Sequence, residues 1–544
     1  MASQTPVVEI SGLSVDFSVD GEWIPALRGV SFIIQSGEVV ACVGESGSGK
    51  STAALAMMGL LPNNSRASGS VRLRGQEILG VAASELRHIR GAQIGMVFQE
   101  PMTALNPVLT AGFQIMEALR AHDGEVTAEA AKKRALELLG MVELPDPEKA
   151  FHSYPHQLSG GQRQRAMIAQ ALALEPALLI ADEPTSALDV TVQAEILDLL
   201  RDLAQRLNQA VLLITHDMAV VADLADRVVV MKQGEIVEQG TTAKLFSAPQ
   251  HPYSKALLEA VPFLGRQGRA DPLPSTEVVI SLESVSIDYP KRGRVPAFRA
   301  ISDLTMDVVA GEVVGVVGES GSGKTTLARA ILGLLPVVSG RLIVEDVELS
   351  GVSPRDLRAL RRRMGIVFQD PGASLNPRWP IGQSIAEPLL LADWDNAKAD
   401  ARVVELLRQV ELDPEYRNRY PHELSGGQRQ RVGVARALAL NPSLVIADEP
   451  TSALDVSVQA KVLALLGRLQ RELGFATVFI SHDLAIVQQL AHRIAVLHNG
   501  RLVEWGLTEQ VLNRPAHPYT KQLIEAVPVP DPALQRARRE ARAH

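Results

Sequence analysis

Cysteine is nearly absent from this chain, whose 544 residues include only Cys42. A single thiol cannot form an internal disulfide, a cysteine-rich zinc site or a cysteine-ligated iron–sulfur cluster. Cys42 lies inside an apolar run at 39–43, and a second apolar run at 313–317 carries Val316 at the matching place. We therefore expect Cys42 to pack in the core as a small hydrophobic residue.

Long apolar runs are also missing. No stretch approaches the 18 residues of a membrane-spanning helix, and the longest runs, such as 39–43 and 211–214, have the length of strands. Residues 1–10 lack the basic start and apolar run of a secretory signal peptide, so none is expected. If the protein acts at a membrane, other chains must supply the spanning helices.

Basic residues are not in excess, because the formal net charge is -8. Proteins that bind nucleic acid are more often basic, so a nucleic-acid partner is disfavoured without being excluded. The length exceeds the roughly 250–300 residues at which a single hydrophobic core stops growing. The sequence therefore predicts several domains.

Internal repetition is the strongest feature of the sequence. Four segments occur twice, with an offset of 274 residues for the first and 266 for the other three. The constant later offset indicates collinear copies, and so long a period indicates duplicated domains. The repeated segments are EVV(A/G)(C/V)VGESGSGK at 38–50 and 312–324, LSGGQRQR at 158–165 and 424–431, ADEPTSALDV at 181–190 and 447–456, and HPY(S/T)K(A/Q)L(L/I)EAVP at 251–262 and 517–528.

The domain boundary is expected between the copies. Residues 263–277 are rich in glycine, proline and charge and lack periodicity, which is typical of a linker. The predicted order is a first domain at 1–262, this linker, a second domain at 278–528 and a basic tail at 529–544. The tail carries four arginines, so it is either a solvated extension or a basic helix near anionic lipid.

Two glycine-rich segments, 44–51 and 318–325, fit the phosphate-binding pattern G-x4-G-K-(S/T). Each follows a strand-like run and precedes a helix-like stretch, so backbone N–H groups and a helix N-terminus would face the phosphates. Lys50 and Lys324 would neutralise β- and γ-phosphate charge, and the hydroxyl residue after each lysine would contact Mg²⁺. The predicted nucleotide residues of the two loops are Gly44, Ser46, Gly47, Gly49, Lys50, Ser51 and Thr52, and Gly318, Ser320, Gly321, Gly323, Lys324, Thr325 and Thr326.

Two further apolar runs, 178–182 and 444–448, end in an acid. Each is interpreted as a buried parallel strand with its aspartate at the carboxyl end, where α/β sheets bind ligands. Asp182 and Asp448 are predicted to hold Mg²⁺, together with Ser51 and Thr325. The glutamates that follow, Glu183 and Glu449, are the candidates to polarise the attacking water, provided that the turn redirects them from the direction of a strand neighbour.

The LSGGQ segments, together with the P-loops, resemble ABC-type ATPases over nearly the entire chain. The resemblance implies an α/β fold with two P-loop ABC-type nucleotide-binding domains, each with a RecA-like core, an antiparallel β subdomain and a helical subdomain. It also implies ATP and Mg²⁺ as ligands. By position in their motifs, Gln99 and Gln369 are similar to the Q-loop glutamine near Mg²⁺, Asp189 and Asp455 to the D-loop aspartate, and His216 and His482 to the switch histidine.

The family resemblance further implies a head-to-tail pairing of cassettes, in which the P-loop of one and the LSGGQ of the other enclose each ATP. Ser425 and Gly427 would then complete the site of Lys50, and Ser159 and Gly161 the site of Lys324. A serine hydroxyl and glycine N–H groups at a helix start suit γ-phosphate chemically. The signature residues predicted to bind nucleotide are Ser159, Gly160, Gly161, Gln162, Ser425, Gly426, Gly427 and Gln428.

An aromatic residue upstream of the P-loop stacks on adenine in this family. Tyr289 fits that place in the second half, and Phe17 is the aligned residue in the first, with Trp23 nearby. Each ring suits stacking on the base, and each is also compatible with packing in the core.

The HPY segments resemble the C-terminal regions of the dipeptide/oligopeptide/nickel importer branch. That resemblance implies an ATPase that drives import through two non-identical multispanning permeases, fed by an extracytoplasmic solute-binding protein. The chain would be peripheral on the cytoplasmic face of the plasma membrane. Peptides lead as the substrate, with nickel, glutathione and haem left open. Some relatives bind an iron–sulfur cluster through several cysteines, which this chain lacks, so no cluster is expected.

Two other classes stay open at this point. Soluble twin-cassette ATPases act on ribosomes or DNA, but the ribosomal ones usually have a long charged helical linker and the DNA-repair ones zinc-binding cysteines. Exporters normally fuse membrane helices to the cassette. The linker here is short, with one cysteine and no long apolar run in the chain, so the importer is favoured.

Overall fold

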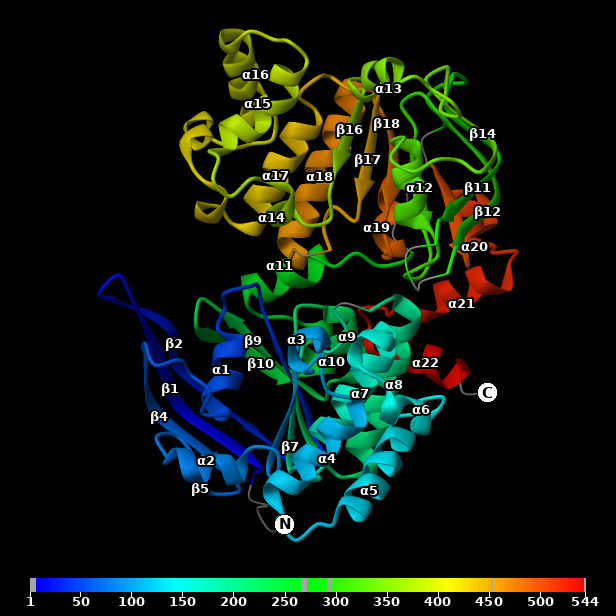
Figure 1. Ribbon diagram of the computed structural model, residues 1–544. Coiled ribbons are helices and arrows are strands. Elements are labelled where there is room, and N and C mark those ends of the chain that lie inside the picture. Colours follow the sequence, from blue (N-terminus) through cyan, green and yellow to red (C-terminus); the bar gives the residue numbers. More distant parts are fainter. Residues whose placement is uncertain are drawn as a thin grey trace. The chain divides into compact units, whose positions relative to one another are not determined.

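The apolar runs of both halves form the central strands of two six-stranded sheets in the computed structural model, which describes residues 6–186, 188–265, 272–291, 293, 296–452 and 454–542 (Figure 1). The chain divides into two units, one of Met1–Val261 with Pro528–His544 and the other of Pro262–Val527. Six residues of the expected linker, 266–271, lie outside the described residues.

The sheet of the first unit has the strand order β10-β9-β3-β8-β7-β6. All neighbours in it are parallel except β9 and β10. Its strands are β3 (Val39–Val43), β6 (Ile94–Val97), β7 (Leu178–Asp182), β8 (Ala210–Thr215), β9 (Arg227–Lys232) and β10 (Glu235–Thr241). The predicted strands at 39–43 and 178–182 are thus confirmed, and β3 is buried at every residue.

The second unit repeats this order as β16-β17-β18-β13-β19-β20. Again only the last pair, β19 and β20, is antiparallel. The strands are β13 (Val313–Val317), β16 (Met364–Val367), β17 (Leu444–Asp448), β18 (Ala476–Ile480), β19 (Arg493–His498) and β20 (Arg501–Leu507).

An antiparallel sheet packs against each parallel sheet, as the family resemblance implies. The orders are β2-β1-β4-β5 and β12-β11-β14-β15. In the first unit, Leu13 and Val71 of this sheet share one hydrophobic cluster with Cys42 and Ile180 of the parallel sheet. The strands are β1 (Val8–Val19), β2 (Glu22–Ile34), β4 (Ser65–Leu73) and β5 (Gln76–Glu77), and β11 (Val278–Tyr289), β12 (Phe298–Val309), β14 (Ser339–Val344) and β15 (Val347–Glu348).

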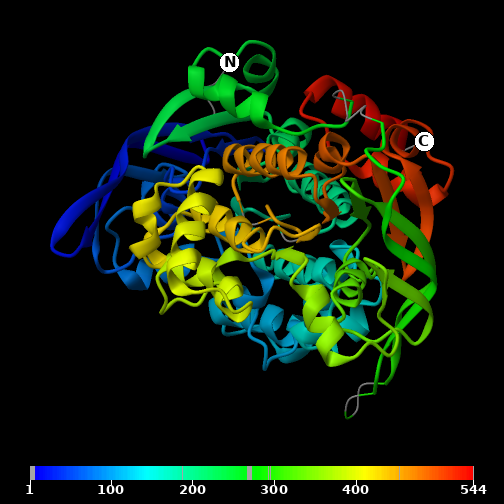
Figure 2. The ribbon, with the colours of Figure 1, turned by 90° about the horizontal axis from the view of Figure 1, so that it is seen from above.

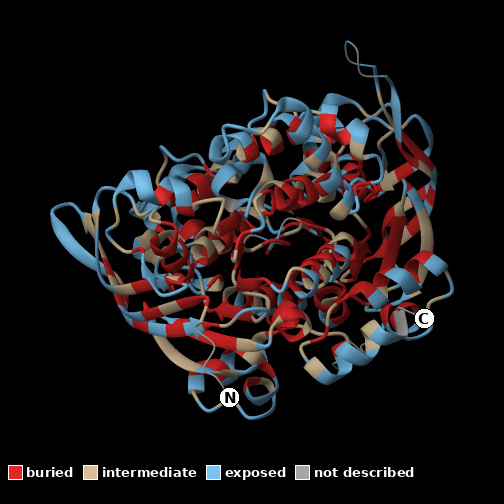
Figure 3. Ribbon diagram, turned by 90° about the horizontal axis from the view of Figure 1, so that it is seen from below, coloured by how far each residue is buried: buried red, intermediate tan, exposed pale blue. Residues whose placement is uncertain are grey.

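Helices cover the parallel sheets, and the buried residues concentrate in the sheets and in the helix faces turned to them (Figure 3). The amphipathic spacing of apolar residues explains these buried faces. The helices of the first unit outside its helical lobe are α1 (Lys50–Met57), α2 (Ala83–Ile89), α7 (Gly160–Ala171), α8 (Val190–Arg206), α9 (Met218–Leu224), α10 (Thr242–Ser247) and α11 (Pro252–Ala260). In the second they are α12 (Lys324–Ile331), α13 (Pro354–Arg361), α17 (Gly426–Ala437), α18 (Val456–Leu473), α19 (Leu484–Leu490), α20 (Thr508–Asn513) and α21 (Pro518–Ala526).

Each unit also has a helical lobe, which lies in the chain between β6 and α7 in the first unit and between β16 and α17 in the second. The lobe of the second unit, yellow in Figures 1 and 2, lies beside α17 and α18. The lobes contain α3 (Pro101–Ala104), α4 (Ala111–His122), α5 (Ala128–Met141) and α6 (Pro147–His152), and α14 (Pro371–Ser374), α15 (Ile381–Leu391) and α16 (Asn396–Gln409). No helix among the described residues is long and apolar enough to cross a membrane.

The basic tail forms a helix, which agrees with one of the two interpretations of the sequence, and it packs on the first unit instead of extending freely. It forms α22 (Pro532–Arg542), which contacts α9 and α10 of the first unit, although it follows the second unit in the chain. Asp531 caps the helix by accepting the N–H groups of Ala533 and Leu534 at 2.9 and 3.0 Å. The tail's last two residues lie outside the described part of the chain.

Side-chain burial and charge explain where the tail docks. Val529 and Gln535 are buried, and Arg539 lies 3.4 Å from the carboxylate of Asp223. The Asp223 side chain is only 6% exposed and also pairs with Arg201 at 2.9 Å. A buried carboxylate needs such partners, which the sequence pattern of the tail alone does not reveal.

A docked tail predicts that the two halves stay together after the linker is cut. With a protease site placed between residues 266 and 271, nucleotide-free halves should co-elute in gel filtration, because α22 stays in the first unit. Removing residues 528–544 should lower the co-eluting fraction severalfold, whereas Arg536→Glu on the exposed side of α22 should not. Unchanged co-elution after truncation would show that the tail does not hold the halves.

Candidate nucleotide site

The order of the parallel strands brings the predicted site residues to one edge of each sheet. β3, β8, β7 and β6 are consecutive neighbours in the first unit. The P-loop, His216, the acidic pair 182–183 and Gln99 lie at or just after their carboxyl ends. Because parallel strands end at the same edge, residues far apart in the sequence meet there. The second unit repeats this arrangement with β13, β18, β17 and β16.

The P-loop backbone is set by glycine at its first position. A Cβ on Gly44 would collide with the carbonyl oxygen of Met231 at the end of β9, and one on Gly318 with that of Leu497. The loop therefore enters α1 along a path that only glycine allows. Gly49, the N-cap of α1, has φ +102, another conformation that favours glycine.

Lys50 is a buried cation held by backbone carbonyls. Its Nζ donates to the carbonyl oxygens of Gly44 at 2.8 Å and Glu45 at 3.0 Å. Within the described residues, no carboxylate forms an ion pair with Lys50. Against the raising effect of burial, the charge of Lys50 acts to lower the pKa of the nearby Asp182 and Glu183, but neither carboxylate lies within ion-pair distance of the ammonium group. A buried ammonium group held mainly by carbonyl oxygens suits an anionic ligand such as a phosphate.

Oxygen groups suited to Mg²⁺ lie beside the lysine. The Ser51 hydroxyl is 3.5 Å from Oδ1 of Asp182, and the Thr325 hydroxyl is 3.5 Å from Oδ1 of Asp448. Hydroxyl and carboxylate oxygens are the hard ligands that Mg²⁺ prefers. Burial raises the pKa of Asp182 above its usual value, against the lowering effect of the Ser51 hydrogen bond. A nearby cation would favour the charged form.

Glu183 turns away from the strand by its backbone conformation. Its φ is +47, and that of Glu449 is +45, a left-handed region that non-glycine residues seldom occupy. The turn therefore redirects the glutamate, as the sequence analysis requires. Observed strain of this kind is often found where a side chain has to be aimed.

His216 and Gln99 converge on the Glu183 carboxylate. Nδ1 of His216 lies 2.8 Å from one oxygen, and Nε2 of Gln99 donates to the other at 2.8 Å. Burial would raise the pKa of Glu183, but the hydrogen bond and charge of His216 hold its pKa below the usual value. The carboxylate is thereby kept ionised, which a group that polarises water requires.

The second site contains the corresponding residues, but the distance between its histidine and its glutamate is longer. Gln369 donates to Glu449 at 3.0 Å, but Nδ1 of His482 lies 3.4 Å from that carboxylate. Burial would lower the pKa of His482, yet its hydrogen bond with Glu449 raises the pKa above the usual value. Both cassettes therefore hold a complete set of the predicted groups, with the histidine farther from the glutamate in the second.

The LSGGQ serines begin helices, as their chemistry suggests. Ser159 caps α7, with its hydroxyl accepting the N–H of Gln162 and the Gln162 side chain accepting the N–H of Ser159. Ser425 and Gln428 form the same capping box at α17. This reciprocal cap fixes the helix start and leaves the first N–H groups directed outward. The pairing of each signature with the P-loop of the other cassette stays a prediction.

Of the aromatic candidates, Phe17 and Tyr289 lie near the ends of β1 and β11, and Trp23 lies near the start of β2. The Tyr289 hydroxyl is 3.3 Å from that of Thr326 beside the P-loop. Phe17 packs partly against the core, and Trp23 is 46% exposed with the Arg66 guanidinium 4.4 Å from its ring centre. Adenine stacking by any of them stays a prediction.

Two residues near the nucleotide site were missed by the sequence analysis. The hydroxyls of Tyr253 and Tyr519 accept the N–H groups of Glu45 and Glu319 in the P-loops, at 3.0 and 3.1 Å. The exact repetition of HPY at one offset could have indicated a role inside the cassette. We used the HPY repeat only to assign the branch of the family.

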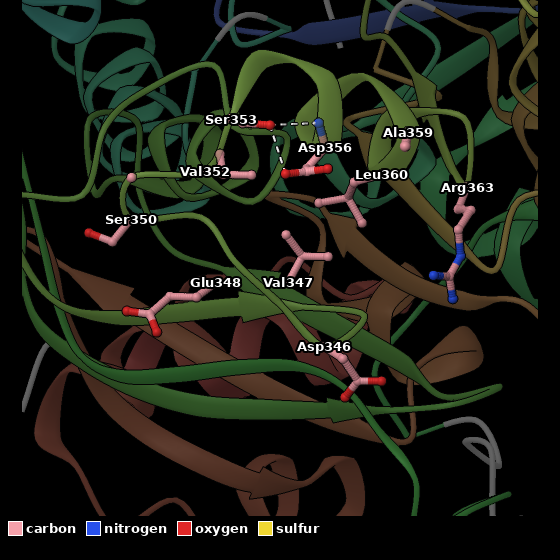
Figure 4. Close-up of a pocket in the computed structure, with 11 residues that line it drawn as sticks. Asp346, Val347, Glu348, Ser350, Val352, Ser353, Asp356, Ala359, Leu360 and Arg363 are labelled. Atoms are coloured by element: carbon pink, nitrogen blue, oxygen red, sulfur yellow. Dashed lines mark hydrogen bonds between the residues drawn. The ribbon is translucent and has the colours of Figure 1, made fainter.

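Two other features lie outside this site. Cys42 packs as expected, buried with its Sγ 3.2 Å from the Met231 sulfur, and burial raises the pKa of its thiol to about 12. A pocket of about 620 Å³ lies between β15 and α13, where Glu348, Asp356 and Arg363 line it (Figure 4). None of the predicted nucleotide residues lines that pocket.

Comparison with known families decides the identity of the two cassettes. The model of the ABC transporter family matches residues 27–186 and 301–452. The chain belongs to the ABC transporter family. The model of the oligopeptide/dipeptide transporter, C-terminal region, matches residues 237–283 and 503–543. The resemblance of this ABC ATPase to the dipeptide/oligopeptide branch is thus confirmed, as is the fold of two α/β cassettes.

This ABC ATPase is similar to curated relatives over nearly its whole length. It is 46% identical over 573 residues to the glutathione import ATP-binding protein GsiA of Escherichia coli (strain K12), covering 98% of this chain and 91% of that protein. The GsiA protein of Salmonella typhimurium (strain LT2) is 46% identical over 570 residues, with the same coverage. Among solved structures, the ATP-binding cassette MJ0796 bound to ADP and Pi matches with 31% identity and a TM-score of 0.39, over 42% of this chain and 98% of that one.

Proposed function

We propose that this ATPase powers an importer for short peptides, including glutathione, and works through separate permease subunits. The observation that carries the proposal is the oligopeptide/dipeptide-type region after each cassette, together with 46% identity over 98% of the chain to a glutathione import ATP-binding protein. The substrate would be captured by an extracytoplasmic solute-binding protein. The ATPase would be held at the cytoplasmic face of the membrane by the permeases.

The chemistry proposed for each site uses the groups described above. Lys50 and the P-loop N–H groups bind the β- and γ-phosphates, while Ser51 and Asp182 hold Mg²⁺ with Gln99 nearby. Mg²⁺ supplies charge neutralisation to the phosphates when bound. Lys324, Thr325, Asp448 and Gln369 serve the second site in the same way.

Glu183 is proposed to orient and polarise the attacking water, with His216 holding its carboxylate ionised and contacting the γ-phosphate. Gln99 and His216 each contact one oxygen of the Glu183 carboxylate. A glutamine that contacts both the base and the proposed Mg²⁺ site would link nucleotide binding to the position of the base. Glu449 and His482 have these roles in the second cassette.

Each ATP is proposed to lie between the P-loop of one cassette and the LSGGQ helix of the other. Donors at the starts of α7 and α17 would then bind the γ-phosphate of the opposite site. Because ATP adds contacts across the interface and hydrolysis removes them, nucleotide would favour a closed arrangement. Fusion in one chain keeps the partner at high effective concentration.

The helical lobes are the proposed docking sites for the permeases. Val108 and Phe113 of the first lobe are 74% and 49% exposed, and Leu391 of the second is 74% exposed. Apolar side chains exposed in this way are typical of an interaction surface. The lobes differ in structure, with α6 in the first replaced by a 3₁₀ helix, Pro414–Asn418, in the second. Two non-identical permeases would fit two different lobes.

Co-purification followed by transport tests this proposal. Tagged chain, expressed with two candidate permeases, should purify as a complex whose ATPase activity rises when a peptide-loaded binding protein is added. Glutathione, a dipeptide, Ni²⁺ and haem would be compared as ligands of the binding protein. If the tagged chain purifies without the permeases, or binds ribosomes or DNA instead, the importer function is contradicted.

A further inference from the structure

The tyrosine of each HPY segment contacts the P-loop of its own cassette. In the first unit the Tyr253 hydroxyl accepts the N–H of Glu45 at 3.0 Å, and Tyr253 is 9% exposed. In the second, the Tyr519 hydroxyl accepts the N–H of Glu319 at 3.1 Å, and Tyr519 is 6% exposed. The same contact therefore occurs twice, in two units of different sequence.

This hydrogen bond acts on the peptide unit that also holds the P-loop lysine. The peptide between Gly44 and Glu45 offers its carbonyl to Nζ of Lys50 and its N–H to Tyr253. The peptide between Gly318 and Glu319 is held from both sides in the same way, by Lys324 at 2.7 Å and by Tyr519. Rotation of either peptide plane would break both contacts at once.

The tyrosines themselves are held firmly. The N–H of Tyr253 donates to Nδ1 of His251 at 3.1 Å, which fixes the start of α11. Glu238 of β10 accepts the N–H groups of Gln250 and His251, at 2.9 and 3.0 Å. The ammonium of Lys232 lies 4.8 Å from the centre of the Tyr253 ring.

In the second unit, the residues at the corresponding positions hold Tyr519 in the same way. The N–H of Tyr519 donates to Nδ1 of His517 at 3.2 Å, and Glu504 accepts the N–H groups of Ala516 and His517. His498 replaces Lys232 and stacks on the Tyr519 ring, with ring centres 3.9 Å apart. A buried hydroxyl fixed by its own segment can hold a loop in one conformation.

We propose that Tyr253 and Tyr519 are positioning residues for ATP binding, because each hydroxyl fixes the P-loop peptide that aligns the phosphate-binding lysine. The HPY segment is thereby a part of the nucleotide site. This inference rests on the nucleotide site proposed above. Loss of the hydroxyl removes one of the contacts that fix the peptide plane, so more of the ATP binding energy is spent on ordering the loop.

The test removes the hydroxyl oxygen of one tyrosine. In a chain whose second site is silenced by Lys324→Ala, Tyr253→Phe should weaken binding of a fluorescent ATP analogue with Mg²⁺ about threefold to tenfold, the effect of one net hydrogen bond. The KM for ATP should rise by a similar factor, with kcat at saturating ATP little changed. Tyr416→Phe, a hydroxyl loss in the second helical lobe, is the matched control and should leave affinity unchanged.

Site specificity separates this role from a structural one. In a Lys50→Ala chain, Tyr253→Phe should leave ATP binding at the Lys324 site unchanged, whereas Tyr519→Phe should weaken it. ATP should also raise the melting temperature of the Tyr253→Phe chain less than that of its parent. Equal affinities in parent and variant, or equal weakening of both sites, would overturn the proposal. Two ATP still bound after Lys50→Ala would instead refute the nucleotide site.

Discussion

A chain with both Glu183→Gln and Glu449→Gln should bind ATP but release phosphate at least about a hundredfold more slowly than the natural chain. Glutamine keeps the size of each side chain but replaces one acceptor oxygen by an NH₂ donor, and it cannot polarise the attacking water as a carboxylate does. The contacts from Gln99 and His216 to Glu183 show that the carboxylate already has the partners that keep it ionised. Steady-state phosphate release at saturating ATP measures the effect.

The single substitutions test whether both sites hydrolyse ATP. Every predicted group is present in both cassettes, so Glu183→Gln alone and Glu449→Gln alone should each lower turnover substantially. Glu85→Gln, an exposed residue of α2, serves as the control and should keep the natural rate. If one of the two single variants turns over at the natural rate, its site is not catalytic.

Double variants should reveal which signature serves which P-loop. Lys50→Ala removes the phosphate-binding charge of one site, and Ser425→Arg places bulk and a cation where γ-phosphate is proposed to bind in that same site. Residues acting as one unit are strongly non-additive. The Lys50→Ala/Ser425→Arg chain should therefore retain about the ATPase activity of the worse single variant.

The double variant with the other signature serine should have much lower ATPase activity. Lys50→Ala/Ser159→Arg damages both proposed sites and should be near inactive in the same phosphate-release assay. Strong cooperativity could silence all single variants, in which case ATP binding at each site replaces turnover as the measurement. If Ser159→Arg, and not Ser425→Arg, abolishes ATP-driven closure at the Lys50 site, each cassette uses its own signature.

Much of the nucleotide site followed from sequence because its elements are local. The apolar runs at 39–43 and 178–182 match β3 and β7, and a P-loop needs only a strand, a glycine turn and a helix. The capping box of Ser159 and Gln162 at the start of α7 is also a local feature, since it needs only a hydroxyl and a glutamine three residues later.

The features that escaped prediction depend on contacts between distant segments. The docking of the tail escaped prediction because nothing in its sequence points to Asp223, more than three hundred residues away. Tyr253 reaches the P-loop only after β10 and α11 fold back over the strand ends. Tertiary packing decides such contacts, and local propensity does not.

The number of ATP molecules bound per chain tests the central claim, that one polypeptide contains two complete nucleotide sites. Equilibrium dialysis with radiolabelled ATP and Mg²⁺ would use the Glu183→Gln/Glu449→Gln chain, in which hydrolysis of bound ATP is slowed. The account predicts two ATP per chain, one after adding Lys50→Ala, and none after adding Lys50→Ala with Lys324→Ala. A single ATP bound by the parent chain, or two retained with Lys50→Ala, would contradict it.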